Sequence, residues 1–423
     1  MSSIPKTRIV ILGAGFGGMY AARSLFSKFK GCDDVEIIVV NRRNYFLFTP
    51  LLHEVATGNI SPENIIEPIR ALLGPNGDLY CGSVESVSLK DRKVFTDQGE
   101  ISYDYLVLAL GSETNFFNIP GATEHCHELK TLEDALKIKN QIIESLEKAL
   151  RIADKAERQK LLSFVVIGGG PTGVELAGEL ADFLWGTFRR YYPAWLIDEI
   201  SISLVHRDAE LLPQFAPAIR GRALKTLLAK KIEVLLSQEV VSISADQVEL
   251  ASGKKITSGM SIWTAGVRPP RIVFDRELET ARDGRLVVDE YLRLKGEENV
   301  FVIGDLACSL DWRTHKPLPA LAQVALRQGR FVADAVYRNL IHRPLLPFRY
   351  RHGGSLVSVG EWRAAGQFGP LHIWGRTAWW FWRAAYWFKL LSVSKRLQVG
   401  LDWFIDLFLP RDVSDYYEGS GKK

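Results

Sequence analysis

The stretch Val165-Val-Ile-Gly-Gly-Gly-Pro-Thr-Gly-Val-Glu-Leu-Ala-Gly-Glu-Leu180 predicts a strand, a glycine-rich turn and a helix in immediate succession. The apolar run 164–167 is typical of a buried strand, and a helical pattern begins near Thr172. Dinucleotide binding requires this order. Gly168 permits the tight turn, Gly170 lets the backbone approach a pyrophosphate, and Gly173 lets the helix pack closely on the strand. The pyrophosphate then lies at the positive end of the helix dipole.

A second copy of the pattern occurs earlier in the chain, as Ile9-Val-Ile-Leu-Gly-Ala-Gly-Phe-Gly-Gly18. Each copy is followed by an apolar strand that ends in a glycine turn. Gly111 follows Gly13 by 98 residues, and the same separation divides Gly266 from Gly168. We interpret this as two nucleotide-binding modules related by duplication, one nested within the sequence of the other. The alternative is one nucleotide site and one structural imitation of it. An enzyme that holds two dinucleotides most simply passes a hydride from one to the other.

Length and composition fit a globular protein of two or three domains, with 423 residues, 47% hydrophobic and 24% charged. The four cysteines lie far apart and form no Cys-x-x-Cys pair. We therefore expect no metal site, no iron–sulfur cluster and no redox disulfide. No apolar segment precedes the first strand, so we expect no secretory signal.

The second strand of each module departs from the usual dinucleotide pattern, in which it ends in Asp or Glu. The first module has Asn41-Arg42 there, and asparagine can still hydrogen-bond a ribose. The second module has His206-Arg207-Asp208 there. Its basic side chains could receive the 2′-phosphate of NADPH, or Asp208 could compensate for the missing acid at the strand end. The choice between NADH and NADPH is therefore open at this point.

Three further segments bear on the architecture. The apolar run 44–58, with Pro50 and Leu51, could line the binding site of a flat ring system, although its composition favours ordinary core packing. Gly304-Asp305 follows the strand 300–303 and is typical of a flavin contact, in which Asp305 accepts from ribityl hydroxyls; a helix cap is the alternative. Residues 129–162 are predicted to form an amphipathic helical connector.

Residues 8–345 resemble the pyridine nucleotide:disulfide reductase superfamily, and the chain closely resembles the type II NADH dehydrogenases, which are non-pumping NADH:quinone oxidoreductases. The resemblance rests on five blocks: 13–18, 44–52, 168–175, Gly304-Asp305, and Ala322-Gln-Val-Ala325 followed by Gln328-Gly329. The last block resembles the family's quinone-site signature. The absence of Cys-x-x-Cys and of paired cysteines distinguishes the chain from the disulfide reductases and the sulfide:quinone reductases.

The resemblance implies an α/β fold with two Rossmann-type dinucleotide-binding domains and a C-terminal amphipathic helical membrane-anchoring region. It assigns 1–120 and 279–345 to an FAD-binding domain, 121–278 to an NAD(P)H-binding domain, and 346–423 to membrane association. It also implies hydride transfer from NADH to FAD, electron transfer to a quinone, and no proton pumping. A homodimer is compatible with it.

The resemblance further implies a set of site residues. Glu175 would lie near the nicotinamide–flavin contact and Gln323 by the quinone head group. Contacts to FAD are expected from Gly13, Gly15, Phe16, Gly17, Gly18, Asn41, Arg42, Pro50, Leu51, Ala109, Gly111, Gly304, Asp305, Ala322 and Gln323. Contacts to NAD(P)H are expected from Gly168, Gly170, Pro171, Thr172, Gly173, Glu175, His206, Arg207, Ala265 and Gly266.

The C-terminal stretch is both basic and rich in tryptophan. Residues 342–396 hold nine Lys or Arg and one acidic residue, Glu361, and residues 371–409 hold six of the 11 tryptophans. The apolar run 378–391 is too short and too charged to span a bilayer. A helix over 395–409 would place Lys395, Gln398, Asp402 and Asp406 on one face and Leu397, Leu401, Phe404 and Phe408 on another.

This pattern favours helices that lie flat on an anionic membrane surface, on the cytoplasmic face of the cell (inner) membrane, where they would reach quinone. Alternatively, these helices could form a dimer interface or lie in the protein core. Nucleic acid is a less favoured partner for the basic residues than an anionic membrane. Two other functions remain open from the sequence. One is an NAD(P)H-dependent reductase for a soluble acceptor such as a ferredoxin, and the other is a non-catalytic nucleotide-sensing peripheral membrane protein.

Overall fold

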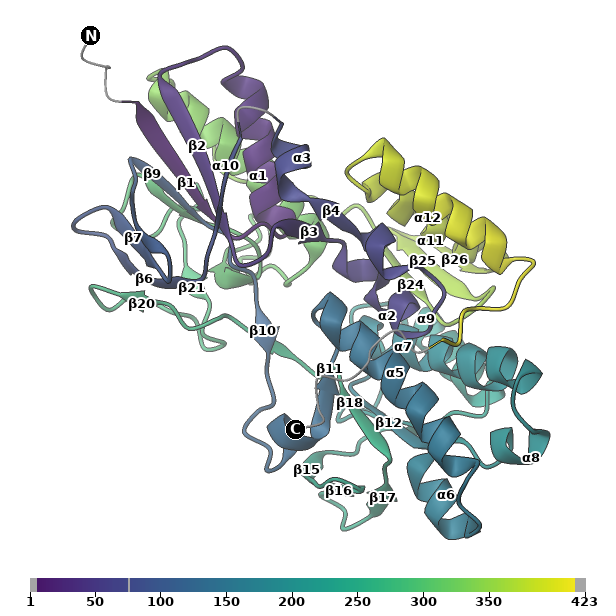
Figure 1. Ribbon diagram of the computed structural model, residues 1–423. Coiled ribbons are helices and arrows are strands. Elements are labelled where there is room, and N and C mark those ends of the chain that lie inside the picture. Colours follow the sequence, from purple (N-terminus) through teal and green to yellow (C-terminus); the bar gives the residue numbers. More distant parts are fainter. Residues whose placement is uncertain (1–5, 75–76, 415–423) are drawn as a thin grey trace. The chain divides into compact units, whose positions relative to one another are not determined.

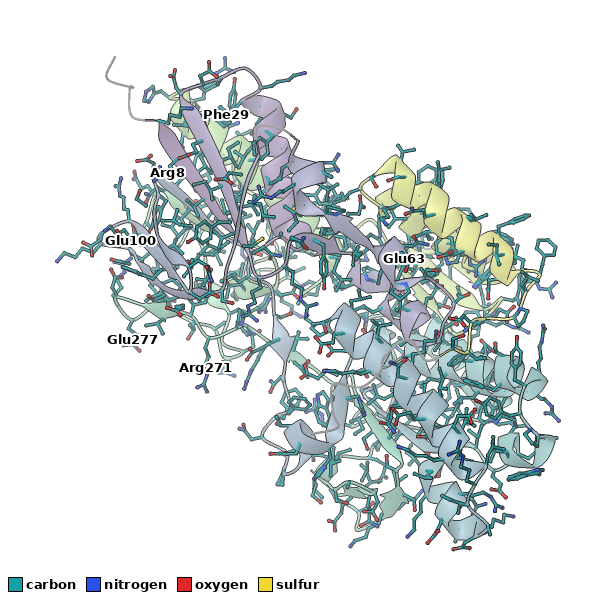
Figure 2. All side chains as sticks on the ribbon, in the orientation of Figure 1. Arg8, Phe29, Glu63, Glu100, Arg271 and Glu277 are labelled. Carbon is teal, nitrogen blue, oxygen red and sulfur yellow. The ribbon has the colours of Figure 1, made fainter. Side chains whose placement is uncertain are left out.

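The computed structural model describes residues 6–74 and 77–414, which divide into two compact units (Figure 1). The first unit comprises Met1–Leu47, Ile66–Glu113 and Val267–His352, and the second comprises Phe48–Ile65, Thr114–Gly266 and Gly353–Lys423. The segment Phe48–Ile65 thus belongs with the second unit, whereas the sequence assigned it to the FAD-binding domain. The C-terminal region from Gly353 is grouped with the second unit as well. Charged side chains such as Glu100 and Arg271 are exposed on the first unit (Figure 2).

The first unit is built on a five-stranded parallel sheet in the order β22-β9-β1-β2-β5. Its strands are β1 (Thr7–Leu12), β2 (Val35–Asn41), β5 (Asp78–Cys81), β9 (Tyr105–Leu108) and β22 (Val300–Val302). The central strand is apolar at every position from Ile9 to Leu12, and these side chains are fully buried. Such continuous burial is expected of a parallel sheet that is covered on both faces.

Helices α1 (Phe16–Lys28) and α10 (Ala322–Leu340) pack side by side in the first unit (Figure 1). Val10 and Leu12 of the central strand share a buried cluster with Val94 and Ile101 of a small antiparallel sheet. The remaining elements are β3 (Tyr45–Leu47), β4 (Ile66–Pro68), α3 (Ile69–Leu73), β6 (Val84–Ser88), β7 (Lys93–Thr96), β8 (Gly99–Ser102), β19 (Val267–Arg268), β20 (Val273–Phe274), β21 (Leu286–Val287), η5 (Gly304–Leu306) and β23 (Ala307–Cys308); β10 (Glu113–Thr114) begins in this unit.

The second unit repeats this plan. Its parallel sheet has the order β11-β18-β12-β13-β14, and an antiparallel sheet, β15-β16-β17, takes the place of β6-β7-β8. The strands are β11 (Cys126–Glu128), β12 (Ser163–Ile167), β13 (Ser201–Val205), β14 (Glu233–Leu235), β15 (Val240–Ile243), β16 (Gln247–Leu250), β17 (Lys255–Thr257) and β18 (Met260–Trp263). Because β12 and β1 occupy equivalent central positions, the repeat inferred from the two glycine motifs is present in the backbone.

The predicted connector over 129–162 is two helices and not one, α5 (Leu132–Ala149) and α6 (Lys155–Leu161). The break has a local cause, because the Asp154 side chain accepts from the Ala156 N–H at 3.1 Å and starts a new helix. The other elements of this region are η1 (Thr49–Leu51), α2 (Leu52–Ala56), η2 (Pro62–Ile65), α4 (Ala122–His125), α7 (Pro171–Ala181), the π-helix η3 (Asp182–Thr187), η4 (Phe188–Arg190), α8 (Ala194–Ile197) and α9 (Pro217–Ala229).

The C-terminal region contains a sheet that the sequence did not predict. Three antiparallel strands, β24 (Ser355–Ser358), β25 (Ala364–Phe368) and β26 (Leu371–Gly375), precede helices α11 (Arg376–Lys389) and α12 (Val393–Asp406) (Figure 1). The strands are only four or five residues long and contain Gly, Ala and Ser, so they show little alternation of apolar and polar residues. Within the described residues, the chain forms no helix with the length and apolar character needed to cross a bilayer.

The contact between α1 and α10 depends on Gly329. A Cβ at this position would lie 2.2 Å from the Gly17 carbonyl oxygen and 2.9 Å from the Ala21 nitrogen, both backbone atoms. We expect Gly329→Ala to destabilise the protein by about 1–3 kcal/mol, because the helices must separate to admit the methyl group. The measurement is unfolding in denaturant.

Gly221→Ala in α9 is the matched control, because nothing lies within 4 Å of the added Cβ. It should stabilise its helix by about 0.5–1 kcal/mol. A Gly329→Ala protein as stable as wild type would contradict this account of the packing.

Candidate nucleotide sites and the buried acid cluster

The first glycine turn brings the start of α1 against the end of β1. Gly13 has φ +96° and donates its N–H to the Val40 carbonyl at 2.7 Å. A Cβ on Gly18 would lie 1.8 Å from the Gly13 carbonyl oxygen, so only glycine allows this approach. Nothing lies within 4 Å of a Cβ built on Gly15, the N-cap of α1. The turn is therefore closed toward the sheet and open where a pyrophosphate would pass.

The second turn has the same geometry. Gly168 has φ +120° and donates to the Val205 carbonyl at 2.9 Å, and a Cβ on Gly173 would lie 1.8 Å from the Gly168 carbonyl oxygen. The N-cap of α7, Gly170, again has no atom within 4 Å of its added Cβ. Pro171 is the first helical residue, where its missing N–H costs nothing. Both sites thus fit a dinucleotide diphosphate.

A residue at the carboxyl end of the second strand holds the glycine loop in both units: Asn41 is the last residue of β2, and His206 directly follows β13. Asn41 accepts from the Ala14 N–H at 3.0 Å and donates to the Arg43 carbonyl at 2.7 Å. In the second unit, His206 Nδ1 accepts from the Gly169 N–H at 3.1 Å. The sequence pattern led us to expect ribose or phosphate contacts at these positions. The structure shows that Asn41 and His206 also stabilise the loop by accepting a hydrogen bond from its backbone. The Asp or Glu that is usual at this position could accept the same bond with its carboxylate.

His206 is suited to this role only as a neutral ring. Burial lowers the pKa of His206, with a smaller opposing effect from Asp208. Because Nδ1 is the acceptor, the proton lies on Nε2, 3.6 Å from Asp208 Oδ2. The Arg207 side chain is 70% exposed, with its Nε 3.5 Å from Asp208 Oδ1. One cation, balanced by one carboxylate, therefore lies at this edge of the second unit.

The Gly304-Asp305 turn is fixed by two polar side chains of the first unit. Ser112 Oγ donates to Asp305 Oδ2 at 2.7 Å, and Gln328 Oε1 accepts from the Gly304 N–H at 2.7 Å. Gln328 is 1% exposed, and its amide also donates to Ser309 Oγ at 2.8 Å. The sequence indicated Asp305 as a flavin contact and placed Gln328 in the block that resembles a quinone-site signature, but it did not predict the contact of Gln328 with Gly304.

Gln323 lies in the first turn of α10, directly after Ala322, and is partly buried. Its Nε2 is 3.4 Å from His352 Nδ1. Burial, followed by the charge of Arg327, lowers the pKa of His352. An amide next to a neutral imidazole can donate or accept a hydrogen bond, which suits a carbonyl ligand.

Glu175, on α7, is buried in the second unit. Its Oε1 accepts two hydrogen bonds, from the Ser358 N–H at 3.0 Å and from Trp382 Nε1 at 3.2 Å. Burial raises the pKa of Glu175 to about 8, against the opposite effect of these two donors. The carboxyl group is therefore mostly protonated near pH 7.

A cluster of buried charges, which we call the acid cluster, adjoins Glu175. Glu54 Oε2 accepts from Trp403 Nε1 at 2.7 Å, and burial raises the pKa of Glu54 to about 8. Arg383 lies 3.3 Å from Asp406 and 3.8 Å from the centre of the Trp379 ring. The other ion pairs join Arg411 to Glu179 at 2.8 Å and to Asp406 at 3.5 Å. Two guanidinium groups thus balance the carboxylates.

Comparisons with known proteins show the family to which the chain belongs. Residues 7–329 match the family described as pyridine nucleotide-disulphide oxidoreductase, and residues 352–412 match the NDH2 C-terminal domain. The probable NADH-ubiquinone oxidoreductase C3A11.07 of Schizosaccharomyces pombe is 32% identical, over 97% of this chain and 83% of its own. The type II NADH:quinone oxidoreductase Ndh of Mycobacterium tuberculosis is 30% identical, over 96% and 89%. The chain belongs to the type II NADH:quinone oxidoreductases.

Solved structures support the same family. NDH2 from Plasmodium falciparum, in complex with NADH, is 25% identical with a TM-score of 0.89, covering 97% of this chain and all of the other. A sulfide:quinone oxidoreductase from Aquifex aeolicus, 18% identical with a TM-score of 0.72, shares the fold. The resemblance identified from the sequence is therefore confirmed.

The structure distributes the predicted site residues of this family member between the two units. The FAD candidates lie in the first unit, except Pro50 and Leu51, which lie in η1 of the second. All NAD(P)H candidates lie in the second unit. Phe16 packs edge-on against Phe46, with ring centroids 5.3 Å apart. Arg42 and Ala265 are exposed, Gly111 is partly buried, and Leu51 and Ala109 are buried.

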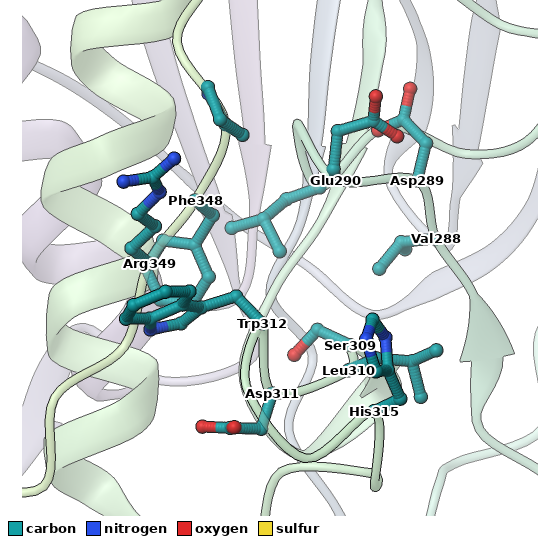
Figure 3. Close-up of a pocket in the computed structure, with 12 residues that line it drawn as sticks. Val288, Asp289, Glu290, Ser309, Leu310, Asp311, Trp312, His315, Phe348 and Arg349 are labelled. Carbon is teal, nitrogen blue, oxygen red and sulfur yellow. The ribbon is translucent and has the colours of Figure 1, made fainter.

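Sequence reasoning missed the partners of Glu175. Ser358 and Trp382 lie 183 and 207 residues away, and neither has a motif that would mark it. Arg383, which interrupts an apolar run in α11, was a weak signal of the acid cluster, because an arginine that is buried there needs acids to pair with it. A separate cavity of about 440 Å³ in the first unit, bordered by Trp312 and Arg349, is lined by none of the predicted site residues (Figure 3).

The raised pKa of Glu54 predicts a dependence of stability on pH. A carboxyl whose pKa rises on folding stabilises the protein fully below its unfolded pKa, and this contribution is lost as the pH rises toward about 8. The pKa of His53 is lowered to about 3, so above about pH 6.5 this histidine is neutral in both states. Glu54→Gln should therefore make the fall in Tm between about pH 6.5 and 8.5 shallower.

Each titrating carboxyl contributes at most about 1.4 kcal/mol per pH unit to the free energy of unfolding. Thermal unfolding at several pH values measures the slope. Glu277→Gln is the control, because Glu277 is exposed and should leave the slope unchanged. An equal slope in wild type and Glu54→Gln would show that Glu54 does not titrate in this range.

Proposed function

We propose that this chain oxidises NADH at the second glycine turn and uses FAD, held by the first unit, to reduce a membrane quinone without pumping protons. The observation that carries this proposal is the pair of glycine turns with matching geometry, each open at the middle glycine, Gly15 and Gly170. One chain with two such turns is suited to hold two dinucleotides. Its relatives are named as NADH:quinone oxidoreductases.

The residues of the first unit fit FAD. The Gly13–Gly18 turn would hold the diphosphate at the start of α1, and Asp305, fixed by Ser112, offers a carboxylate to the ribityl hydroxyls. Bound FAD supplies the redox chemistry, because it accepts a hydride and can release the electrons to quinone. Gln323 would orient the quinone head group through its amide.

The second unit favours NADH over NADPH. His206 is engaged by the glycine loop and is held neutral by burial, so it offers no positive charge to a 2′-phosphate. Asp208 lies close to both His206 and Arg207 and would repel that phosphate. The same carboxylate can accept a hydrogen bond from a ribose hydroxyl.

Stopped-flow absorbance of the flavin tests this function. NADH should bleach the flavin, NADPH should bleach it more slowly, and a short-chain quinone should restore the absorbance. Asp208→Asn should narrow the difference between the two coenzymes without abolishing reduction by NADH. Protein without bound flavin, or flavin that NADH never bleaches, would remove the proposed activity. Bleaching by NADPH alone would reverse the coenzyme assignment.

We also propose that α11 and α12 dock the enzyme on the cytoplasmic face of the cell (inner) membrane. Asp402 and Asp406 of α12 point into the second unit, whereas Gln398 of the same predicted face is exposed. Asp402 accepts from the Ser61 N–H at 3.0 Å and from Asn64 Nδ2 at 2.7 Å. The opposite face exposes Leu397, Leu401 and Phe404 by 66%, 58% and 59%. Further exposed apolar side chains nearby in sequence are Trp380, Phe381, Phe388, Val393, Ile405, Phe408 and Leu409.

The exposed apolar side chains support membrane docking more strongly than the basic residues do. Several of the basic residues in 342–396 are used inside the second unit. Lys395 donates to the Glu63 carbonyl at 2.6 Å, Arg396 donates to the Leu390 carbonyl at 3.0 Å, and Arg383 belongs to the acid cluster. Exposed apolar patches of this kind are typical of membrane or protein contacts.

Replacing Leu397, Leu401 and Phe404 together with Glu should release the enzyme from liposomes and lower turnover with long-tailed quinones. Turnover with short-chain quinones should stay near the wild-type value. Leu228→Glu, at another exposed apolar position, is the control. Substitution is sharper than truncation before Trp374, which would also remove Arg383, Asp406 and Arg411 from the core.

Sedimentation with liposomes and analytical ultracentrifugation are the two measurements. A triple variant that still sediments with liposomes would contradict membrane docking by this face. If that variant also changed from dimer to monomer, the patch would be a homodimer interface instead.

A further inference from the structure

Helix α11 presents adjacent residues to opposite sides. Trp380 and Phe381 are exposed by 50% and 55%, whereas Trp382 and Arg383 are buried. Trp382 donates its indole N–H to Glu175, and Arg383 pairs with Asp406. The helix proposed to lie on the membrane therefore also contacts the acid that we place near the nicotinamide.

Both hydrogen bonds to Glu175 go to the same oxygen. Ser358 N and Trp382 Nε1 lie 3.0 Å and 3.2 Å from Oε1. A carboxyl oxygen that accepts two N–H groups has no lone pair left for a proton. The exchangeable proton of this carboxyl group therefore lies on Oε2.

We propose that Trp382 is a positioning residue of the reaction, which fixes the orientation of Glu175 and confines its proton to Oε2. This inference rests on the proposed function, in which Glu175 lies at the nicotinamide–flavin contact. The C-terminal domain then contributes directly to the site in addition to any role in membrane docking. Trp382 is rigid enough for this task, because it is fully buried and packs against Tyr386 and His53, with ring centroids 4.8 Å and 5.8 Å away.

The charged and titratable groups around Glu175 affect its proton affinity in different directions. Glu54 on α2 and Glu179 on α7 raise the pKa of Glu175 by repulsion. The Ser358 and Trp382 donors lower it, because they stabilise the carboxylate. The remaining neighbours from packed elements are Tyr386 and Arg383 on α11, His53 on α2, Asp406 on α12 and Arg411 beyond it.

Trp382→Phe tests the inference, since it removes the N–H and keeps an aromatic ring. Loss of one donor to a carboxylate should raise the pKa of Glu175, so the corresponding limb of the pH profile for flavin reduction by NADH should move up by about one pH unit. Trp379→Phe is the matched control, because it removes a similarly buried indole of α11 that makes no hydrogen bond to Glu175 and keeps an aromatic ring beside Arg383. Its profile should stay where the wild-type profile is.

Glu175→Gln distinguishes a wrong assignment of Glu175 in the proposed function from a wrong role for Trp382. If the limb of the pH profile persists in Glu175→Gln, the assignment of Glu175 in the proposed function is wrong. If the limb disappears in Glu175→Gln but does not move in Trp382→Phe, Glu175 matters and the role of Trp382 is wrong. A limb that moves equally in Trp382→Phe and Trp379→Phe would indicate a general packing effect and would also overturn the inference.

A measurement on the wild-type holoenzyme covers the case in which Trp382→Phe does not fold. The indole ¹⁵N–¹H resonance of Trp382 should shift with pH as Glu175 titrates. This shift should be absent in Glu175→Gln, and the other indole resonances serve as internal controls. If no indole resonance titrates in wild type in a manner that Glu175→Gln abolishes, Trp382 does not sense the protonation of Glu175.

Discussion

The approach of a helix to within van der Waals contact of a glycine turn is the constraint on which both units depend. In each unit the helix begins so close to the preceding strand that a single methyl group at Gly18 or Gly173 would collide with a backbone oxygen. This approach aligns the helix N-terminus with the carboxyl end of the sheet. The location of each nucleotide site follows from it, and Asn41 and His206 secure the loop in this position.

The second unit combines a nucleotide fold with a densely charged interior. Glu54, Glu175, Glu179 and Asp406 lie in a region where isolated carboxylates would be unstable, and Arg383 and Arg411 make their burial possible. Both arginines come from the C-terminal domain. That domain is therefore required for the electrostatic balance of the interior, and it leaves an apolar face of α12 exposed. These two tasks, balancing buried acids and exposing an apolar face, account for the many tryptophans and buried charges of the C-terminal domain.

The sequence was sufficient for the parts of the fold that depend on local chemistry. Glycine spacing predicted both modules and their relation, and five sequence blocks, among them the one with Gln323 and Gln328, led to the family, which the comparisons confirmed. The division of the C-terminal region into β24, β25 and β26 was not predictable, because short strands derive their stability from neighbours distant in sequence. The partners of Glu175 were hidden for the same reason. The inward direction of Asp402 and Asp406 could not be read from amphipathicity alone, since a helix with two faces does not reveal which face is buried.

The position of Arg411 has a consequence for biosynthesis. This residue follows α12, yet it is buried and pairs with Glu179, which is made more than 200 residues earlier. Asp412 likewise reaches Lys139 of α5, at 3.1 Å. The pairing of Glu179 with Arg411 therefore cannot form until residue 411 has left the ribosome. Before that point Glu179 must stay hydrated, so the interior of this unit consolidates only after α12 and Arg411 have been made. A chain that stopped near residue 400 would lack Asp406 and Arg411, which pair with Arg383 and Glu179.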